Sequence, residues 1–369
     1  MNHPKTCYNA CSWRCAGPDN HWHYRPDAMS FYERDSGIIE AQGLPLTLLD
    51  LCLQRGLHGD RVLRGTRLFM DDLIQRNPRI SQEQLLQLAD NAERLLDSSD
   101  SAFLLGQRLL PGNLHGASQL LSQAPNLFSA LESLVEFAPL LSPLLSPRLV
   151  VDENYGYLYW LDSCGTGKQW RFLLEASATA VAAFSRRHRG EHLPWQFHFR
   201  HSRPPYIEQY WVHLGETLHF DQPCDMLRVP RQWLFEGIKP AGISHQVALQ
   251  QARQQLQTLP APRPLLVAVY HHLEQQLKQP ANHRTLQLES VAESLGMSPA
   301  TFKRHLKKHG THFQQQLDLA RLHTAIYLLR SQGLGTEAVA RQLGFHDSAG
   351  LRRSFKRWTG STPSSVLAL

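Results

Sequence analysis

The stretch MSPATFKRHLKKHG, from Met297 to Gly310, decides how the C-terminal part of this chain folds. A serine hydroxyl can cap a helix and proline suits the first helical position, so Ser298 and Pro299 mark a helix start. Phe302 and Leu306 are four positions apart and would share the inward face of that helix. The stretch therefore predicts a short helix with one buried face.

The residues just before it predict another short helix. Val291, Ala292 and Leu295 recur at helical spacing, and Gly296 supplies the left-handed C-cap that allows a sharp turn. Two short helices joined through such a turn are typical of a helix-turn-helix motif, whose second helix enters the major groove of DNA. The candidate DNA-contacting residues of this helix are Ser298, Ala300, Thr301, Lys303, Arg304 and Lys307.

The same pattern returns 49 residues later in HDSAGLRRSFKRWTG, from His346 to Gly360. A preceding short helix again ends at a glycine, either Ser348 or Asp347 can cap the next helix, and Leu351 and Phe355 face inward. The candidate DNA-contacting residues of this second copy are Ser348, Ala349, Arg352, Arg353 and Lys356.

One copy alone would be explained equally well by a helical hairpin with a solvated basic face, but two copies in register favour DNA binding. Arginine can donate two hydrogen bonds to guanine, while lysine mainly neutralises phosphate. Charge supports this interpretation: Ala281–Leu369 carries twelve Lys and Arg against five Asp and Glu, so the rest of the chain has a net charge of about −1. Double-stranded DNA is the predicted partner, read in successive major grooves.

The N-terminal part predicts a different class of fold. From Gly43 to about Leu145 the pattern indicates helices, including a capping box made by Ser81 and Gln84. A β-hairpin is then predicted for RLVVDENYGYLYWLD, and a long helix ended by Gly190 for QWRFLLEASATAVAAFSRRHRG. After these the pattern predicts a strand in WQFHFRH, a helix in YIEQYWVHL and a strand in TLHFD. We expect an α+β N-terminal domain.

Three prolines between Pro260 and Pro264 mark a break or stiff linker, beyond which the pattern is entirely helical. The expected organisation is a poorly ordered N-terminal extension over residues 1–36, an α+β domain over 37–259 and an all-α DNA-binding domain over 260–369. A fragment from about Pro262 to the C-terminus should then fold on its own.

Several other patterns were weighed as chemical sites. His3, Cys7, Cys11 and Cys15 are spaced by four, which on a helix separates them too far for one tetrahedral zinc ion, so no metal site or other cofactor is predicted. The GTGK segment at Gly165–Lys168 lacks the earlier glycine and the Ser or Thr of a phosphate loop. An aromatic-rich region is the candidate effector pocket, although such residues more often form core: Tyr157, Tyr159, Trp160, Trp195 and Tyr210.

The C-terminal part resembles the AraC/XylS family of bacterial transcription regulators. The resemblance is carried by AVARQLGFHDSAGLRRSFKRWTGSTP and by FQQQLDLARLHTAIYLLRSQG, which matches the long helix joining the two motifs of that family. Leu351 stands where an aromatic is usual, and Gly350 lies inside the second recognition helix. The segments LPLTLLDLCLQRGL, HGASQLLSQAPNLFSALE and FRHSRPPYIEQYWVHLGETLHFDQPCDMLRVPRQWL resemble the longer effector domain of the subgroup that includes ornithine-responsive regulators.

The resemblance implies a regulator controlled by a small molecule bound to the N-terminal domain, which could be an amino-acid-derived metabolite or a fatty acid. It also implies RNA polymerase as a partner, and a homodimer is a candidate assembly. No apolar run is long enough to span a membrane, and we expect a cytoplasmic protein that is not an enzyme. The alternatives are an enzyme domain fused to a DNA-binding domain and an architectural DNA-binding protein.

Overall fold

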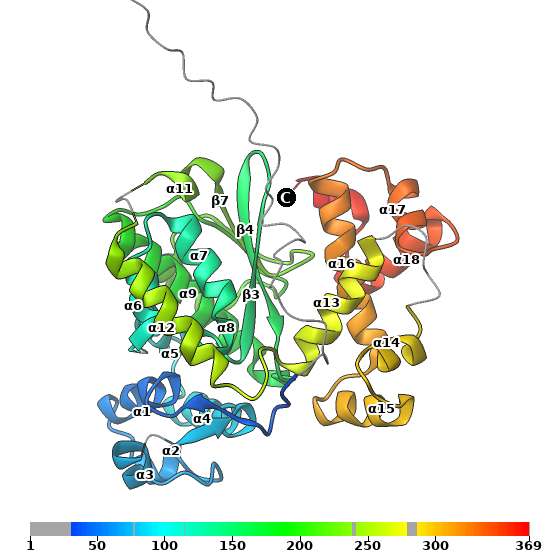
Figure 1. The fold of residues 1–369 in the computed structure, drawn as a ribbon. Coiled ribbons are helices and arrows are strands. Elements are labelled where there is room, and N and C mark those ends of the chain that lie inside the picture. The colour runs from blue at the N-terminus through cyan, green and yellow to red at the C-terminus, as the bar shows by residue number, and fades with distance from the viewer. Residues whose placement is uncertain (1–30, 77, 114, 238–240, 279–285, 369) are drawn as a thin grey trace, which may run out of the picture.

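The computed structural model describes residues 31–76, 78–113, 115–237, 241–278 and 286–368. The chain begins with a helical layer, visible at the bottom of Figure 1, against which a two-stranded antiparallel sheet of β1 and β2 packs. The Ser81–Gln84 capping box forms as predicted at the start of α4. The elements of this first part are β1 (Gly37–Glu40), α1 (Leu44–Gln54), α2 (Gly59–Val62), α3 (Met70–Gln75), β2 (Arg79–Ser81), α4 (Gln82–Leu96), α5 (Ser101–Leu109), α6 (His115–Ser122), α7 (Leu127–Glu136) and α8 (Ala138–Leu141).

A five-stranded sheet with the order β3-β4-β7-β5-β6 lies at the centre of the molecule. The predicted hairpin is β3–β4, paired from Leu145 opposite Asp162 to Val151 opposite Gly156. All neighbouring strands are antiparallel except β5 and β6. The elements are β3 (Leu145–Val151), β4 (Tyr155–Asp162), η1 (Gly167–Gln169), α9 (Trp170–Arg189), β5 (Gln196–His198), α10 (Ile207–Leu214), β6 (Leu218–His219), β7 (Met226–Pro230), α11 (Arg231–Phe235) and α12 (Ile243–Gln257).

The remaining elements are all helical: α13 (Leu265–Lys278), α14 (Leu288–Ser294), α15 (Pro299–Lys308), α16 (Phe313–Arg330), α17 (Thr336–Gln342), α18 (Ser348–Thr359) and η3 (Pro363–Ala368). The predicted fold class, an α+β part followed by an all-α part with two helix-turn-helix motifs joined by a long helix, is confirmed. Among the described residues, no helix is both long and apolar enough to cross a membrane.

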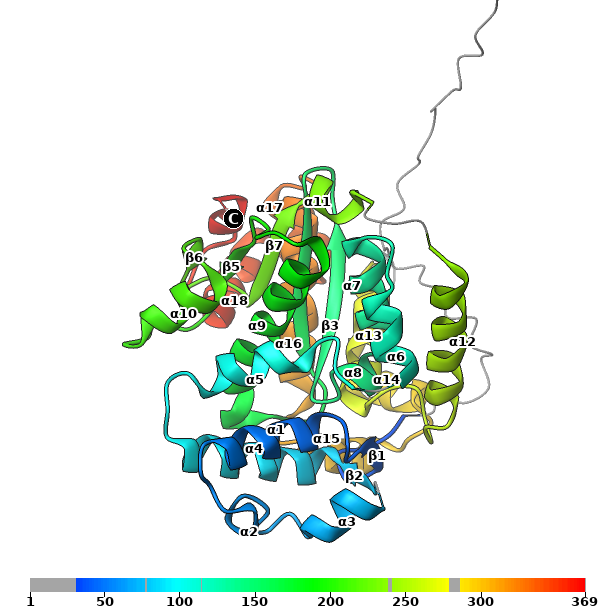
Figure 2. The same ribbon diagram turned by 90° about the vertical axis from the view of Figure 1, so that its left-hand side faces the viewer.

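Helices cover both faces of the central sheet. Those on the second face belong to the C-terminal part. Side chains alternate along β4: Leu158 and Trp160 pack into the core with α9, while Tyr157 and Leu161 pack with α13 and α16. Figures 1 and 2 show the sheet between these two groups of helices. The C-terminal helices thus form a third layer, rather than a unit tethered only by the proline-rich linker.

An ion pair also crosses between these layers. Arg148 of β3 donates to Glu274 of α13 at 2.8 Å and lies 2.6 Å from Nε2 of His271. Burial tends to raise the pKa of Glu274, but the charges of Arg148 and Lys278 outweigh it, so the pKa lies below its usual value. The carboxylate therefore stays ionised and holds the sheet to α13.

Residues 31–36, expected to belong to a poorly ordered extension, are packed instead. Tyr32 is 3% exposed, its N–H donates to the carbonyl of Arg263 at 2.9 Å, and its own carbonyl accepts from Leu265 N–H at 3.0 Å. Tyr32 therefore lies beside the linker, where it forms a β-bridge with Pro264. The predicted extension over residues 1–36 therefore has to end before residue 31. The Cys- and His-rich pattern at residues 3–15 lies outside the described residues.

Candidate nucleic-acid interface and ligand-sensing region

The first helix-turn-helix motif consists of α14 and α15. Gly296 between them has a φ of 69°, a left-handed conformation that glycine adopts at little cost. Ser298 caps α15, because its Oγ accepts from Thr301 N–H at 3.2 Å. Phe302 and Leu306 are fully buried. The cap and the buried face fix the orientation of α15 against α14.

The second motif, α17 and α18, repeats this arrangement with a different cap. Gly344 makes the turn with a φ of 78°. Of the two candidate caps, Asp347 is the one used, since its Oδ1 accepts from Gly350 N–H at 2.6 Å. This hydrogen bond is the main reason why the pKa of Asp347 is lowered. Leu351 and Phe355 are fully buried and hold α18 on the motif.

The outward faces of α15 and α18 are open to solvent. Lys308 and Arg357, which neighbour these faces, are engaged with carboxylates: Lys308 with Glu33 at 2.9 Å and Arg357 with Asp318 at 3.1 Å. Within the described part of the chain, by contrast, no ion pair involves the six cations on the faces themselves. Among the other predicted residues, Thr301 and Ser348 are half-buried, and Ser298 is exposed but its hydroxyl caps α15. The exposed stripes are Ala300, Lys303, Arg304 and Lys307 on α15, and Ala349, Arg352, Arg353 and Lys356 on α18.

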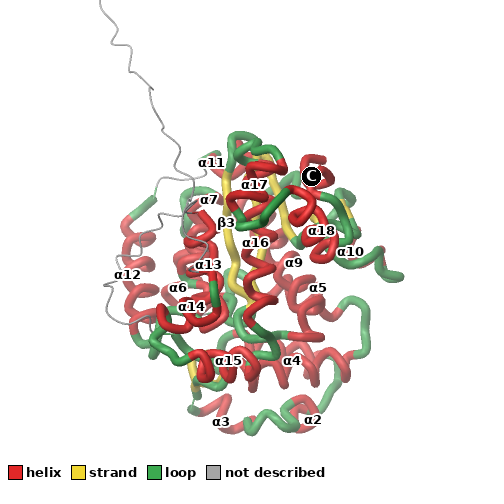
Figure 3. Tube along the Cα trace, turned by 90° about the vertical axis from the view of Figure 1, so that its right-hand side faces the viewer, coloured by secondary structure: helices red, strands yellow, loops and turns green. Residues whose placement is uncertain are grey.

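Helix α16 separates the two motifs, as predicted. It has 18 residues, which corresponds to about 27 Å at 1.5 Å per residue. Figure 3 shows α15 near one end of α16 and the α17–α18 motif near the other. The predicted packing positions Leu317, Ala320, Ala325 and Leu328 are all buried. A continuous, packed helix of this kind keeps the two recognition helices at a fixed separation.

The five aromatic residues predicted to line an effector pocket do not come together in one pocket. Tyr157 and Tyr159 face α16 and line a small pocket of ≈ 70 Å³ with Arg330, whose Nε donates to Tyr157 OH at 3.0 Å. Trp160 instead lines a larger cleft nearby. Side chains along β4 alternate between the two faces of the sheet, so that of Trp160 packs into the core with α9 and away from Tyr157 and Tyr159.

The other two predicted residues lie in the core of the N-terminal part. Trp195 is 6% exposed and its Nε1–H donates to Ser185 Oγ at 3.0 Å. Tyr210 is fully buried and belongs to a polar network around Glu175. Neither residue lines the pocket of Tyr157 or the cleft of Trp160.

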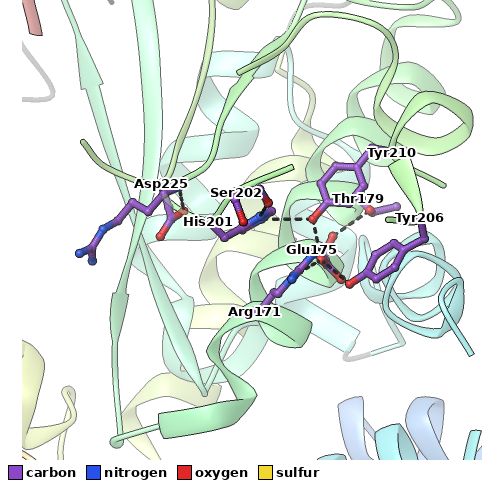
Figure 4. Close-up of polar contacts among 9 residues, drawn as sticks. Arg171, Glu175, Thr179, His201, Ser202, Tyr206, Tyr210 and Asp225 are labelled. Atoms are coloured by element: carbon purple, nitrogen blue, oxygen red, sulfur yellow. Dashed lines mark hydrogen bonds and ion pairs between the residues drawn. The ribbon is translucent and has the colours of Figure 1, made fainter. Parts of the chain in front are cut away.

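Glu175 is a buried carboxylate that the sequence analysis missed. Its Oε1 accepts from Arg171 Nε at 2.9 Å, from Tyr210 OH at 2.5 Å and from Tyr206 OH at 3.2 Å. Figure 4 shows these side chains converging from α9 and α10, with His201 Nε2 3.2 Å from Tyr210 OH. Burial, followed by the charge of Glu175, raises the pKa of Tyr206 to about 12, so this tyrosine stays a donor. A signal for the network was available, because a glutamate within the apolar run FLLEASATA is expected to need buried partners.

The N-terminal part touches the C-terminal end of each recognition helix. At α15, Arg34 Nη1 donates to the carbonyl of Lys308 at 3.2 Å, and His309 Nδ1 lies 3.2 Å from the carbonyl of Cys164. At α18, Arg200 Nη2 donates to the carbonyl of Trp358 at 3.2 Å. Carbonyls at a helix end lack partners within the helix and attract cations, so the two arginines are suited to these positions.

The GTGK segment takes part in this docking. The carboxylate of Asp162 accepts the backbone N–H groups of Cys164, Gly165 and Thr166, which closes the loop tightly. Gly165 then lies directly against the end of α15: a Cβ added to it would be 1.9 Å from the carbonyl oxygen of His309. Only glycine fits this contact.

Comparison with known proteins agrees with both parts of the structure. Residues 56–236 match the family model described as the arabinose-binding domain of AraC transcription regulator, N-terminal, and residues 291–368 match a helix-turn-helix domain. The ornithine utilization regulator of Pseudomonas aeruginosa is 30% identical over 327 residues, which cover 86% of this chain and 93% of that protein. This chain belongs to the AraC/XylS family of transcription regulators.

Other relatives of this regulator match it over shorter lengths or more distantly. The HTH-type transcriptional regulator VqsM of Pseudomonas aeruginosa is 33% identical over 75 residues, covering 20% of this chain and 22% of that protein. The crystal structure of the transcriptional regulator CdpR from Pseudomonas aeruginosa is 19% identical and covers 88% of this chain and 97% of that one, with a TM-score of 0.38. The AraC-type regulator described here thus combines a helix-turn-helix DNA-binding part with an arabinose-binding-type effector domain.

Proposed function

We propose that α15 and α18 of this transcription regulator are its two base-reading helices and enter successive major grooves on one face of the operator. The observation that carries the proposal is the pair of exposed cationic stripes, which form no ion pair with the described residues and belong to motifs joined by α16. The length of α16, about 27 Å, is of the order of one helical turn of DNA, about 34 Å. Arg304, Arg352 and Arg353 are suited to guanine edges, and the lysines to phosphates.

Selection of binding sites from a random DNA library by the full-length protein tests this. The expected result is two short conserved boxes whose centres are about one helical turn apart, with guanines at the most restricted positions. Protection of the backbone should extend over both boxes. A single box, or no enrichment over random DNA, would contradict the use of two reading helices.

We also propose that a small molecule bound by the effector domain changes the affinity for DNA. Support comes from the contacts that join the N-terminal part to the ends of α15 and α18, because a ligand that alters the N-terminal side of these contacts also alters the energy of the DNA-binding side. The relative is named for ornithine utilization, so amino acids and their derivatives are the first class to test. Anisotropy titrations of the selected DNA, with and without each compound, should show a shift of about 5- to 150-fold for the effector.

Further partners and location follow from the same proposal. An AraC-type regulator of this kind acts on chromosomal DNA in the cytoplasm beside RNA polymerase. A homodimer stays a prediction, to be checked by light scattering with and without operator DNA.

A further inference from the structure

A cleft between the effector and DNA-binding parts has the features of a ligand site. Its volume is ≈ 610 Å³, within the usual range for small-molecule pockets. Its walls come from the sheet end and the start of α9 on one side, and from α16 and the ends of α15 and α18 on the other; they include Trp160, Trp170, Asp225, His309, Asp318 and Trp358. A molecule bound there would touch the ends of both recognition helices.

His309, a residue of the cleft wall, has a buried acceptor without a donor among the described residues. The side chain is 1% exposed, and Nδ1 lies 3.2 Å from the carbonyl of Cys164, which can only accept a hydrogen bond. Nδ1 therefore carries the proton, and burial lowers the pKa of His309, so the imidazole is neutral. Its Nε2 is then an acceptor, and it is buried with no partner among the described residues. A buried acceptor of this kind calls for an N–H or O–H donor.

Asp225 adds a carboxylate to the cleft, whose two hydrogen-bond donors carry no charge. Its carboxylate accepts from the backbone N–H of Arg200 at 2.8 Å and from Trp170 Nε1–H at 3.2 Å, and both of these donors are neutral. Burial raises the pKa of Asp225, and the opposing charge of Arg200, which lines the same cleft, does not reverse this direction. Trp170, whose indole N–H donates to Asp225, lines the same cleft and can stabilise a cation over its face.

Trp358 supplies the complementary donor. Its Nε1–H is buried and has no acceptor among the described residues, and the residue lines the cleft at the end of α18. Such a donor is satisfied by a carboxylate or carbonyl oxygen. The cleft thus offers acceptors and aromatic faces for a cation, and a separate donor for an oxygen.

We propose that this cleft is the effector site and that it takes a small molecule with both a protonated amine and a carboxylate, such as an amino acid. The amine interacts with Asp225 and His309, and the carboxylate with Trp358. Binding links the sheet of the effector domain to the ends of α15 and α18, and so sets the relative position of the two reading helices. The proposal rests on small-molecule control as proposed above, and adds its location and chemistry.

Calorimetric titration of the full-length protein with three probes tests this chemistry: L-ornithine carries amine and carboxylate, putrescine only amines, and glutarate only carboxylates. We expect L-ornithine to bind at least tenfold more tightly than putrescine, and glutarate not to bind. Trp358→Phe should weaken L-ornithine at least fivefold and leave putrescine within twofold, because it removes the indole N–H donor while an aromatic side chain stays in place. Asp225→Asn should weaken both amines at least tenfold.

The matched control is Asp50→Asn, which removes the same charge from an exposed position on α1 and should leave both affinities unchanged. Failure of both amines to bind the native protein would overturn the proposal, as would unchanged binding to Trp358→Phe and Asp225→Asn. Trp358→Phe keeps an aromatic side chain at the partly buried position 358, so it remains informative even if Asp225→Asn does not fold. Fluorescence anisotropy on the same samples distinguishes failure of the cleft as the site from failure of small-molecule control. If L-ornithine still changes DNA affinity in both variants, small-molecule control holds and the effector site lies elsewhere.

Discussion

Arg304 lies in the middle of the exposed stripe of α15, between Lys303 and Lys307 along the chain, and no ion pair involves it within the described residues. A guanidinium in this position can make two hydrogen bonds to a guanine. Arg304→Ala should therefore weaken binding to the selected DNA by about 1–3 kcal/mol and relax base preference at one position. Fluorescence anisotropy with the selected site and its single-base variants measures both. Arg61→Ala, on the exposed side of α2, is the control and should change neither.

The lysines at the ends of the stripes should behave differently from Arg304. Lys307 and Lys356 are exposed ammonium groups with no carboxylate partner in the described chain, and each can neutralise one phosphate. Lys307→Ala and Lys356→Ala should each reduce the slope of log affinity against log salt by about one unit, with equal losses on specific and random DNA. An unchanged slope would remove that lysine from the interface.

Among the elements, the loop after β4 packs against the C-terminal end of α15. Gly165 has a φ of 79° and no room for a Cβ, whereas Gly167 in the same loop has a φ of 56° and no atom within 4 Å of an added Cβ. Gly167→Ala should cost only the backbone strain, about 1–2 kcal/mol. Gly165→Ala should cost more, because it also displaces His309 from the loop. Thermal unfolding of the two variants gives this comparison.

The same pair of variants tests whether the docking of α15 matters for DNA. If the loop positions the first reading helix, Gly165→Ala should change DNA affinity at a temperature where the protein is still folded, and Gly167→Ala should not. Equal DNA affinities in the two variants would mean that the contact only stabilises the fold.

For the whole molecule, the interface between the sheet and the C-terminal helices makes stability depend on pH. Burial lowers the pKa of His323 on α16 to about 4, and this ring packs on Tyr159 and lies 3.0 Å from Tyr270 OH. The unfolded chain takes up the proton near pH 6.5, so it binds more protons than the native state between about pH 6.5 and 4. Stability should fall as the pH drops through this window. Urea unfolding at several pH values measures it, and His323→Gln should flatten the dependence.

The shared core also changes what we expect of the isolated C-terminal part. Separation at Pro262 removes Arg148, which pairs with Glu274, and uncovers the faces of α13 and α16 that pack on Tyr157 and Leu161. A fragment of residues 262–369 should therefore unfold at a lower temperature than the full-length protein, in contrast to the independent unit predicted from the linker. Equal unfolding temperatures would show that the sheet adds nothing to the stability of these helices.

Local pattern was sufficient for the reading helices. A helix cap or a left-handed turn depends only on neighbouring backbone groups, so Ser298, Pro299 and Gly296 predict their local structure from a few positions of the chain. The spacing of Phe302 and Leu306 likewise predicts the buried face, and hence the exposed stripe. β7 was not predicted, although it is central in the sheet: its residues, MLRVP, are too few to show a clear alternation.

The candidate effector site could not be predicted in the same way. Its aromatic residues were named from composition, but which of them meet is decided by the two faces of β4 and by helices far along the chain. The contact of His309 with Cys164 joins residues 145 positions apart, and that of Arg200 with Trp358 joins residues 158 positions apart. No periodicity within a segment specifies such pairs.

The sequence by itself determined two helix-turn-helix motifs, each with an exposed basic face, because helix caps, turns and apolar spacing are short-range properties of the chain. Only the tertiary structure decided that the C-terminal helices close the open face of the sheet, that the GTGK loop serves as a docking surface for α15, and that Asp225, His309 and Trp358 line one cleft. These features depend on which surfaces bury one another, and burial is a property of the whole folded chain.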